Sequence, residues 1–130
     1  MIDAMESPEL VEIELTTDER RLLTAGMWEW HGPARCSERL AVAMGFQDKE
    51  DLFHETRRLI AALDNHESLS RKDWTRALLA TEIVFASGIF GSGVDWPTTV
   101  GWSDEETIKT LRLLQRKLMR SGAISREGLY

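Results

Sequence analysis

The segment that starts at Ser70 constrains the fold most strongly, because it opens with a helix-start signal and then continues without a polar face. Ser70 and Asp73 have the spacing of a capping box, in which side chains bind the free N–H groups of a first helical turn. Beyond Arg76 the sequence is apolar on nearly every side, with Glu82 as its only charge. A helix without a polar face is usually buried at the centre of a domain. The sequence therefore predicts a central apolar helix over 71–90.

Four amphipathic helices are expected to pack around this central helix. Thr16 with Glu19 and Ser103 with Glu106 form two more capping boxes. The expected helices are one over about 17–30, one ending near 44, one beginning after Asp48, and one over about 104–120. The residues expected to face the core are Leu22, Leu23, Gly26, Met27 and Trp30 in the first helix, Leu52, Phe53, Thr56, Leu59, Ile60 and Leu63 in the third, and Ile108, Leu111, Leu114 and Leu118 in the last.

The N-terminal part differs from the rest in charge and pattern. Residues 1–19 carry seven acids and no base, and the stretch "VEIEL" at 11–15 alternates as a half-buried strand does, although no partner strand is evident. We expect residues 1–15 to form an extended acidic arm over the core. Residues 16–130 are expected to form a single all-α domain, a compact bundle of about five helices.

Composition narrows the possible environments and partners. The chain has 130 residues and a net charge of −6, which argues against binding of nucleic acid through phosphate contacts. The single cysteine, Cys36, excludes a disulfide framework and suits a reducing compartment. The chain opens without a signal-peptide pattern, and its longest apolar run is too short to span a bilayer. These features predict a cytoplasmic protein with no membrane partner.

The stretch "IFGSGVDWPTTVGW" at 89–102 lies between two expected helices and is long for a connector. Trp96 precedes Pro97, so we expect it to be extended. The glycine-rich sequence matches neither a phosphate loop nor a nucleophile elbow. Two interpretations remain open. Either Trp96 and Trp102 cover the end of the core, or Asp95, Trp96 and Trp102 bind a partner or ligand.

Glu82 is a second candidate binding residue. A carboxylate in an apolar helix has to be paired, neutral or directed at a cleft, because burying a lone charge is costly. Arg57 and Arg112 are candidate partners. Alternatively, Glu82 would line a small-molecule pocket together with Asp95 and Trp96.

Signals for catalysis or metal binding are weak. The three histidines, His31, His54 and His66, have no metal-ligand spacing, and "HETRR" at 54–58 lacks the second histidine of a zinc helix. No catalytic residue, metal or cofactor is predicted, and the balance is against an enzyme.

Three further features bear on partners. Residues 37–59 have the general shape of a helix-turn-helix, but acids stand where phosphates would approach.

The last helix carries five basic residues, which form either a solvated face or a docking surface for an acidic partner, including the acidic arm of a second copy. Trp28 and Trp30 cannot both face the core, so one of them is expected to be partly exposed or covered by a neighbouring segment.

Together these features predict a small protein-interaction or regulatory module, and one concrete form of this prediction is a protein that neutralises a basic toxin. A protein partner is expected, a homodimer is possible, and nucleic acid is unlikely as a partner. Two alternatives remain: a DNA-binding regulator using residues 37–59, and a small-molecule binder or enzyme with a pocket near Glu82, Asp95 and Trp96.

Overall fold

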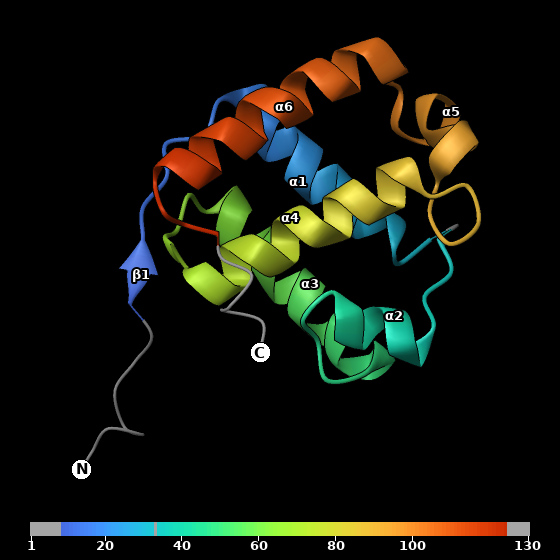
Figure 1. Ribbon diagram of the computed structural model, residues 1–130, viewed down its shortest axis with the longest axis horizontal. Coiled ribbons are helices and arrows are strands. Elements are labelled where there is room, and N and C mark those ends of the chain that lie inside the picture. The colour runs from blue at the N-terminus through green and yellow to red at the C-terminus, as the bar shows by residue number, and fades with distance from the viewer. Residues whose placement is uncertain (1–8, 33, 125–130) are drawn as a thin grey trace.

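The computed structural model describes residues 9–32 and 34–124, and it confirms an all-α bundle (Figure 1). About five helices were expected, and six are found in the described residues because the connector at 89–102 contains a short helix of its own. The elements, in chain order, are β1 (Leu10–Val11), α1 (Thr17–Glu29), α2 (Glu38–Ala43), α3 (Lys49–Asp64), β2 (Leu69–Ser70), α4 (Arg71–Ala86), a 3₁₀ turn (Gly93–Asp95), α5 (Trp96–Val100) and α6 (Asp104–Arg120).

Helix α4 lies at the centre of the bundle, with α1, α3 and α6 packed around it (Figure 1). It ends at Ala86 and not at residue 90, because Ser87 is extended and the chain turns back onto the helix end. The N–H of Ser92 donates to the carbonyl of Val84 at 2.7 Å. At Gly91 a Cβ atom would lie 2.4 Å from that carbonyl oxygen, so only glycine allows the backbone to approach this closely.

Helix α1 buries the face that its sequence predicts: Leu22, Leu23, Gly26, Met27 and Trp30 are all buried. Its closest approach to α4 is at Gly26, where a Cβ atom would lie 2.7 Å from Thr81 Oγ1. Thr81 is itself fully buried and donates to the carbonyl of Ala77 at 2.9 Å. The pair Gly26 and Thr81 therefore sets how closely the two helices pack.

Substitution of Gly26 by alanine is expected to destabilise the protein by about 1–3 kcal/mol, because the added methyl group collides with Thr81. Without this collision, the higher helix propensity of alanine would stabilise the protein by roughly 1 kcal/mol relative to glycine. Chemical denaturation of Gly26→Ala, Thr81→Ala and the double variant would measure the coupling. The double variant should be more stable than the sum of the two single effects implies. Strict additivity would contradict the proposed collision.

The arm finds a strand partner that the sequence did not reveal. β1 pairs antiparallel with β2, with Leu10 opposite Ser70 and Val11 opposite Leu69. Trp74 Nε1 donates to the carbonyl of Val11 at 3.0 Å. The partner strand has only two residues, so its alternation is too short to be recognised. The part of the expected arm at 1–8 lies outside the described residues.

The arm also contacts the last helix within the same chain. Lys117 Nζ donates to the carbonyl of Glu14 at 2.9 Å and to Glu19 Oε1 at 2.6 Å. Glu19 is buried and at the same time closes the capping box with Thr16. One of the basic residues of α6 therefore fixes the end of the acidic arm against the core.

The inner face of α6 contains Leu111, Leu114 and Leu118 as expected, but it begins at Thr107 and not at Ile108. Ile108 is 48% exposed, whereas Thr107 is fully buried together with Leu114 and Leu118. The Thr107 hydroxyl donates to the carbonyl of Ser103 at 2.8 Å and accepts a hydrogen bond from a buried tryptophan, so a polar residue is satisfied inside the core. The expectation that Ile108 faces the core is wrong for this reason.

Candidate functional site

Trp96 lies in the core at the junction of α4, α5 and α6. Its side chain is fully buried, its Nε1 donates to Thr107 Oγ1 at 2.8 Å, and its ring packs edge-on against Phe85. Its backbone is helical, with φ −51° and ψ −48°, so the expected extended conformation before Pro97 is wrong. The buried contacts of the indole outweigh the local bias, and Pro97 stands in the first turn of α5, where its missing N–H is not needed.

The other two residues of this segment that were expected to bind behave differently from each other. Trp102 is 8% exposed, and the Arg21 guanidinium lies over its ring at 4.5 Å. Asp95 is exposed at the end of the 3₁₀ turn. The two tryptophans therefore cover the end of the core, and Asp95 alone of the three presents its side chain fully to solvent.

Glu29, at the end of α1, holds the segment in place. Its Oε1 accepts hydrogen bonds from the hydroxyls of Ser92 and Thr99, the latter at 2.9 Å. Sequence reasoning missed this role, because the acceptor is more than sixty residues away from both donors. The segment 89–102 is thus a fixed cap and not an open loop.

Glu82 has a neutral partner. Gln115 Nε2 donates to Glu82 Oε2 at 2.6 Å, and Arg112 Nη1 donates to Gln115 Oε1 at 2.6 Å. Of the two expected arginines, Arg112 is linked to the carboxylate through this glutamine. Arg57 lines a different part of the surface. Glu82 and Trp96 have separate partners on α6, Gln115 and Thr107, so the geometry does not assemble the predicted pocket from them.

A buried ionic cluster joins α3 to the first turn of α4. Asp73 accepts hydrogen bonds from Arg76 and from Arg58 Nη2, the latter at 3.0 Å, and Arg76 also donates to Glu55 at 3.1 Å. Burial raises the pKa of Asp73, but the two arginines outweigh burial and hold this pKa below its usual value. The pKa of Glu55 is lowered, chiefly by its hydrogen bond with Arg58. Asp73 thus serves the arginines instead of closing the predicted capping box with Ser70.

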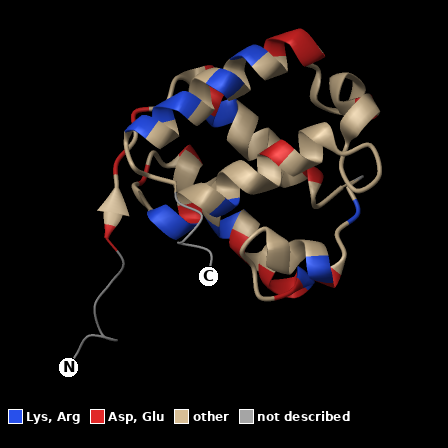
Figure 2. Ribbon diagram, in the orientation of Figure 1, with Lys and Arg blue, Asp and Glu red and all other residues tan. Residues whose placement is uncertain are grey.

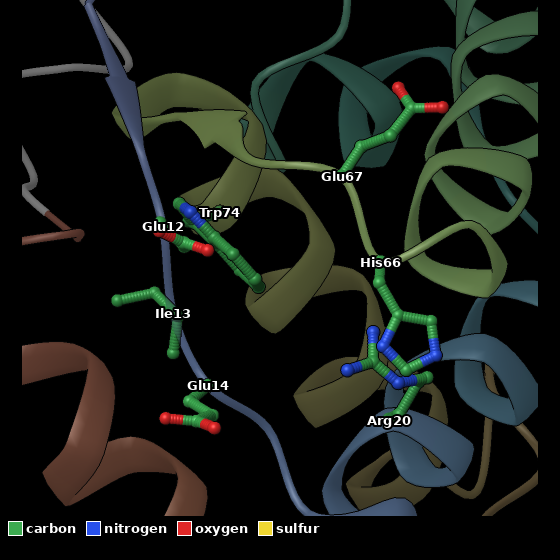
Figure 3. A pocket seen from close by; sticks show the side chains of 7 residues that line it. All are labelled: Glu12, Ile13, Glu14, Arg20, His66, Glu67 and Trp74. Carbon is green, nitrogen blue, oxygen red and sulfur yellow. The ribbon is translucent and has the colours of Figure 1, made fainter.

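One pocket lies beneath the arm (Figure 3). The arm supplies Glu12, Ile13 and Glu14 on one side, and the opposite side carries His66, Glu67 and Arg20. Arg20 is already engaged, because its Nη1 donates to the carbonyl of Leu63 at 2.7 Å. The lining contains both acidic and basic side chains. They do not form a group of like side chains that converges on one point.

A second depression, of about 580 Å³, lies where the end of α1 meets α3. A row of aromatic rings runs through this region: His31 contacts both Trp28 and Phe53, with ring centroids 5.4 Å apart in each case. Trp28 is 49% exposed and Phe53 is 39% exposed, whereas Trp30 is buried. The expectation that Phe53 faces the core with the rest of its helix stripe is therefore wrong, because the stripe is wider than the face that α3 buries. We refer to Trp28, His31 and Phe53 as the aromatic surface. His31 and Phe53 of this surface line the depression, whereas Trp28 stands beside it, and the rest of the lining consists of Trp30, Gly32, Ala34, Glu50, His54 and Arg57.

His31 is fixed within this surface, in surroundings that lower its pKa and so favour the neutral ring. Its Nε2 lies 2.7 Å from Thr56 Oγ1, and the Thr56 hydroxyl proton is directed to the carbonyl of Leu52 at 2.7 Å. The hydroxyl oxygen therefore accepts from His31 Nε2, which leaves Nδ1 as a hydrogen-bond acceptor. Partial burial, and secondarily the charge of Arg57, lower the pKa of His31. The aromatic surface is therefore apolar, with one neutral acceptor.

The expected helix-turn-helix segment at 37–59 forms α2 and most of α3. Its acids stabilise the turn: Asp48 caps α3, and Glu38 accepts from the N–H of Lys49 at 2.9 Å. Arg58 is committed to Glu55 and Asp73. Of the two arginines of this segment that could contact DNA, Arg58 is therefore engaged in folding, whereas Arg57 is exposed.

Across residues 9–32 and 34–124, no group of three or more His, Cys, Asp or Glu side chains is placed to hold a metal ion. None of the helices in those ranges combines the length and the apolar character needed to cross a membrane. Comparisons with known protein families, with curated proteins and with solved structures found no match.

Proposed function

We propose that this protein is a small interaction module that binds a protein partner through its aromatic surface. The observation that carries the proposal is the exposure of Trp28 and Phe53 on either side of His31. The other four tryptophans, Trp30, Trp74, Trp96 and Trp102, are buried in the core. Exposed tryptophan beside a shaped depression is typical of interaction hot spots, since it buries a large area and keeps a polar N–H.

The partner that fits this surface inserts an apolar side chain into the depression and donates a hydrogen bond to His31 Nδ1. The net charge of −6 favours a partner that is basic overall, because long-range attraction speeds association. A basic toxin that the protein neutralises is the most specific form of this proposal. We place this action in the cytoplasm, in keeping with the lone Cys36.

Two other functions have less support. Among the described residues Arg58 is paired with Glu55 and Asp73 and Arg57 is in no ion pair, and acids surround the turn, so DNA binding is disfavoured. A small-molecule site at Glu82, Asp95 and Trp96 is disfavoured by the burial of Trp96. The one thiol of the chain, Cys36, is not activated as a nucleophile, since burial raises its pKa.

Replacement of Trp28 and Phe53 by alanine is expected to weaken partner binding by roughly thirty-fold or more, the effect of losing a hot spot of about 2 kcal/mol. The partner would first be isolated from extract of the native cell by affinity to the wild type. Its binding to each purified variant would then be titrated. Because Trp28 is the single exposed tryptophan, acrylamide quenching of the wild-type fluorescence should also decrease in the complex.

The matched control is Val94→Ala, which shortens an apolar residue that is 87% exposed in the 3₁₀ turn. Circular dichroism would establish that all variants are folded. Equal affinity of the wild type and the Trp28 and Phe53 variant would exclude the aromatic surface as the contact site.

A further inference from the structure

A basic ridge runs along the outer face of α6. It consists of Lys109, Arg112, Arg116 and Arg120, which are all exposed. Their intervals of three, four and four residues place them on one side of the helix over roughly 16 Å. The acidic residues of α6 are confined to its first turn, Asp104 to Glu106, and none occurs between 107 and 124. Arg112, Arg116 and Arg120 therefore have no acidic residue within four positions along the helix. Figure 2 shows the ridge as successive blue bands on α6.

Apolar side chains flank the ridge on both sides. Ile108 is 48%, Leu113 is 53% and Met119 is 69% exposed. Within the described part of the chain, Lys109, Arg116 and Arg120 take part in no ion pair. Unpaired cations interspersed with exposed apolar residues match a partner surface that carries both carboxylates and an apolar group.

The arm of the same chain has such a surface. Because alternate residues of an extended chain point to opposite sides, Val11, Ile13 and Leu15 pack toward the core while Leu10, Glu12 and Glu14 face solvent. We refer to Leu10, Glu12 and Glu14 as the acidic strip. Leu10 is 63% exposed, and neither carboxylate of the strip is in an ion pair with another described residue.

The strip and the ridge are neighbours on one molecule. The bond from Lys117 to the carbonyl of Glu14 brings the arm to the C-terminal end of α6 (Figure 2). In a dimer with two-fold symmetry, an axis that passes between the strip and the ridge would place the strip of each copy opposite the ridge of the other. We propose that the protein forms a symmetric dimer in which the acidic strip of each copy docks on the basic ridge of the other. This proposal uses a different surface from the aromatic one and is independent of it.

Other anionic occupants fit the ridge less well. The chain outside the ridge is more negative than the total of −6, so it repels a polyanion such as duplex DNA. An anionic bilayer requires a contiguous apolar stripe, whereas the apolar residues of α6 stand on both sides of the cations. A second copy supplies carboxylates and Leu10 at the same time.

The experiment is a charge swap followed by sedimentation equilibrium at about 200 μM protein, in about 25 mM and about 500 mM salt. The wild type is expected to approach twice the monomer mass at low salt and to move toward the monomer mass at high salt. The ridge variant Lys109→Glu with Arg116→Glu should remain monomeric, and so should the strip variant Glu12→Lys with Glu14→Lys. The four substitutions combined should restore the dimer, because both charges of each pair are exchanged.

The matched control is Arg35→Glu with Arg39→Glu, which reverses two exposed arginines beside and on α2 and should leave the dimer intact. Circular dichroism checks folding, and the milder Lys109→Gln with Arg116→Gln replaces any variant that fails it. A monomeric wild type at both salt concentrations, or a ridge variant that dimerises as the wild type does, overturns the proposal. A monomer that binds a duplex oligonucleotide or anionic vesicles through the ridge overturns it in favour of that ligand.

Discussion

Replacing Trp96 with alanine is expected to lower the free energy of unfolding by about 3–5 kcal/mol, because it removes a large buried side chain. The indole is fully buried, it donates to Thr107 at 2.8 Å, and it packs against Phe85. Its removal exposes or empties the junction of α4, α5 and α6. Urea denaturation followed by circular dichroism would measure the change, with the midpoint shifting more than the slope.

Two smaller substitutions separate the contributions of the ring and of its N–H. Trp96→Phe keeps an aromatic ring but removes the donor, and Thr107→Val removes the acceptor and leaves a buried indole N–H unsatisfied. Each is expected to cost about 1–3 kcal/mol. Trp28→Ala, on the surface, should cost under about 1 kcal/mol. A Trp96→Ala protein as stable as the wild type would contradict the role of this residue as a cap of the core.

Replacing Asp73 with alanine is expected to cost about 3–5 kcal/mol, because it leaves the buried Arg76 with too few partners. The Arg76 side chain is 8% exposed, and its Nε already has no hydrogen-bond partner within the described part of the chain. Glu55 remains as its acceptor, and Phe46 lies under the guanidinium at 5.0 Å. The expected cost is lower for Arg58→Met, since that side chain is 45% exposed and its pairing is screened by water.

The same cluster predicts how stability depends on pH. The pKa values of Asp73 and Glu55 are lower in the folded protein than their ordinary values near 4. The stability they contribute is therefore fully present above about pH 5, and it is lost as the pH falls through the lowered folded-state values. Denaturation at a series of pH values should show that the free energy of unfolding falls less steeply below pH 4 in Asp73→Ala than in the wild type. If the free energy of unfolding depends on pH equally steeply in both proteins, the cluster does not govern acid unfolding.

Local signals in the sequence determined the parts of this fold that depend on a few adjacent residues. The capping boxes at Thr16 and Ser103 form as expected, and Gly45 has the left-handed backbone that ends α2. These features follow from hydrogen bonds and dihedral preferences that act within four or five residues. The periodic apolar faces of α1 and α3 are likewise readable, because each needs only the 3.6-residue repeat of the helix.

Tertiary structure decided every feature that depends on a distant partner. Trp96 is helical despite the following proline, because its buried indole binds Thr107 and Phe85. Asp73 is drawn away from its capping role by Arg58 and Arg76, since the buried Arg76 needs a carboxylate, whereas the helix start is already capped by the hydroxyl of Ser70. Which of the two tryptophans near the end of α1 reaches the solvent was also settled by packing, because α4 covers Trp30 through the carbonyl of Ala80. A single sequence does not show which distant residues come into contact. The aromatic surface, the ionic cluster and the pairing of the arm could therefore be recognised only in the folded structure.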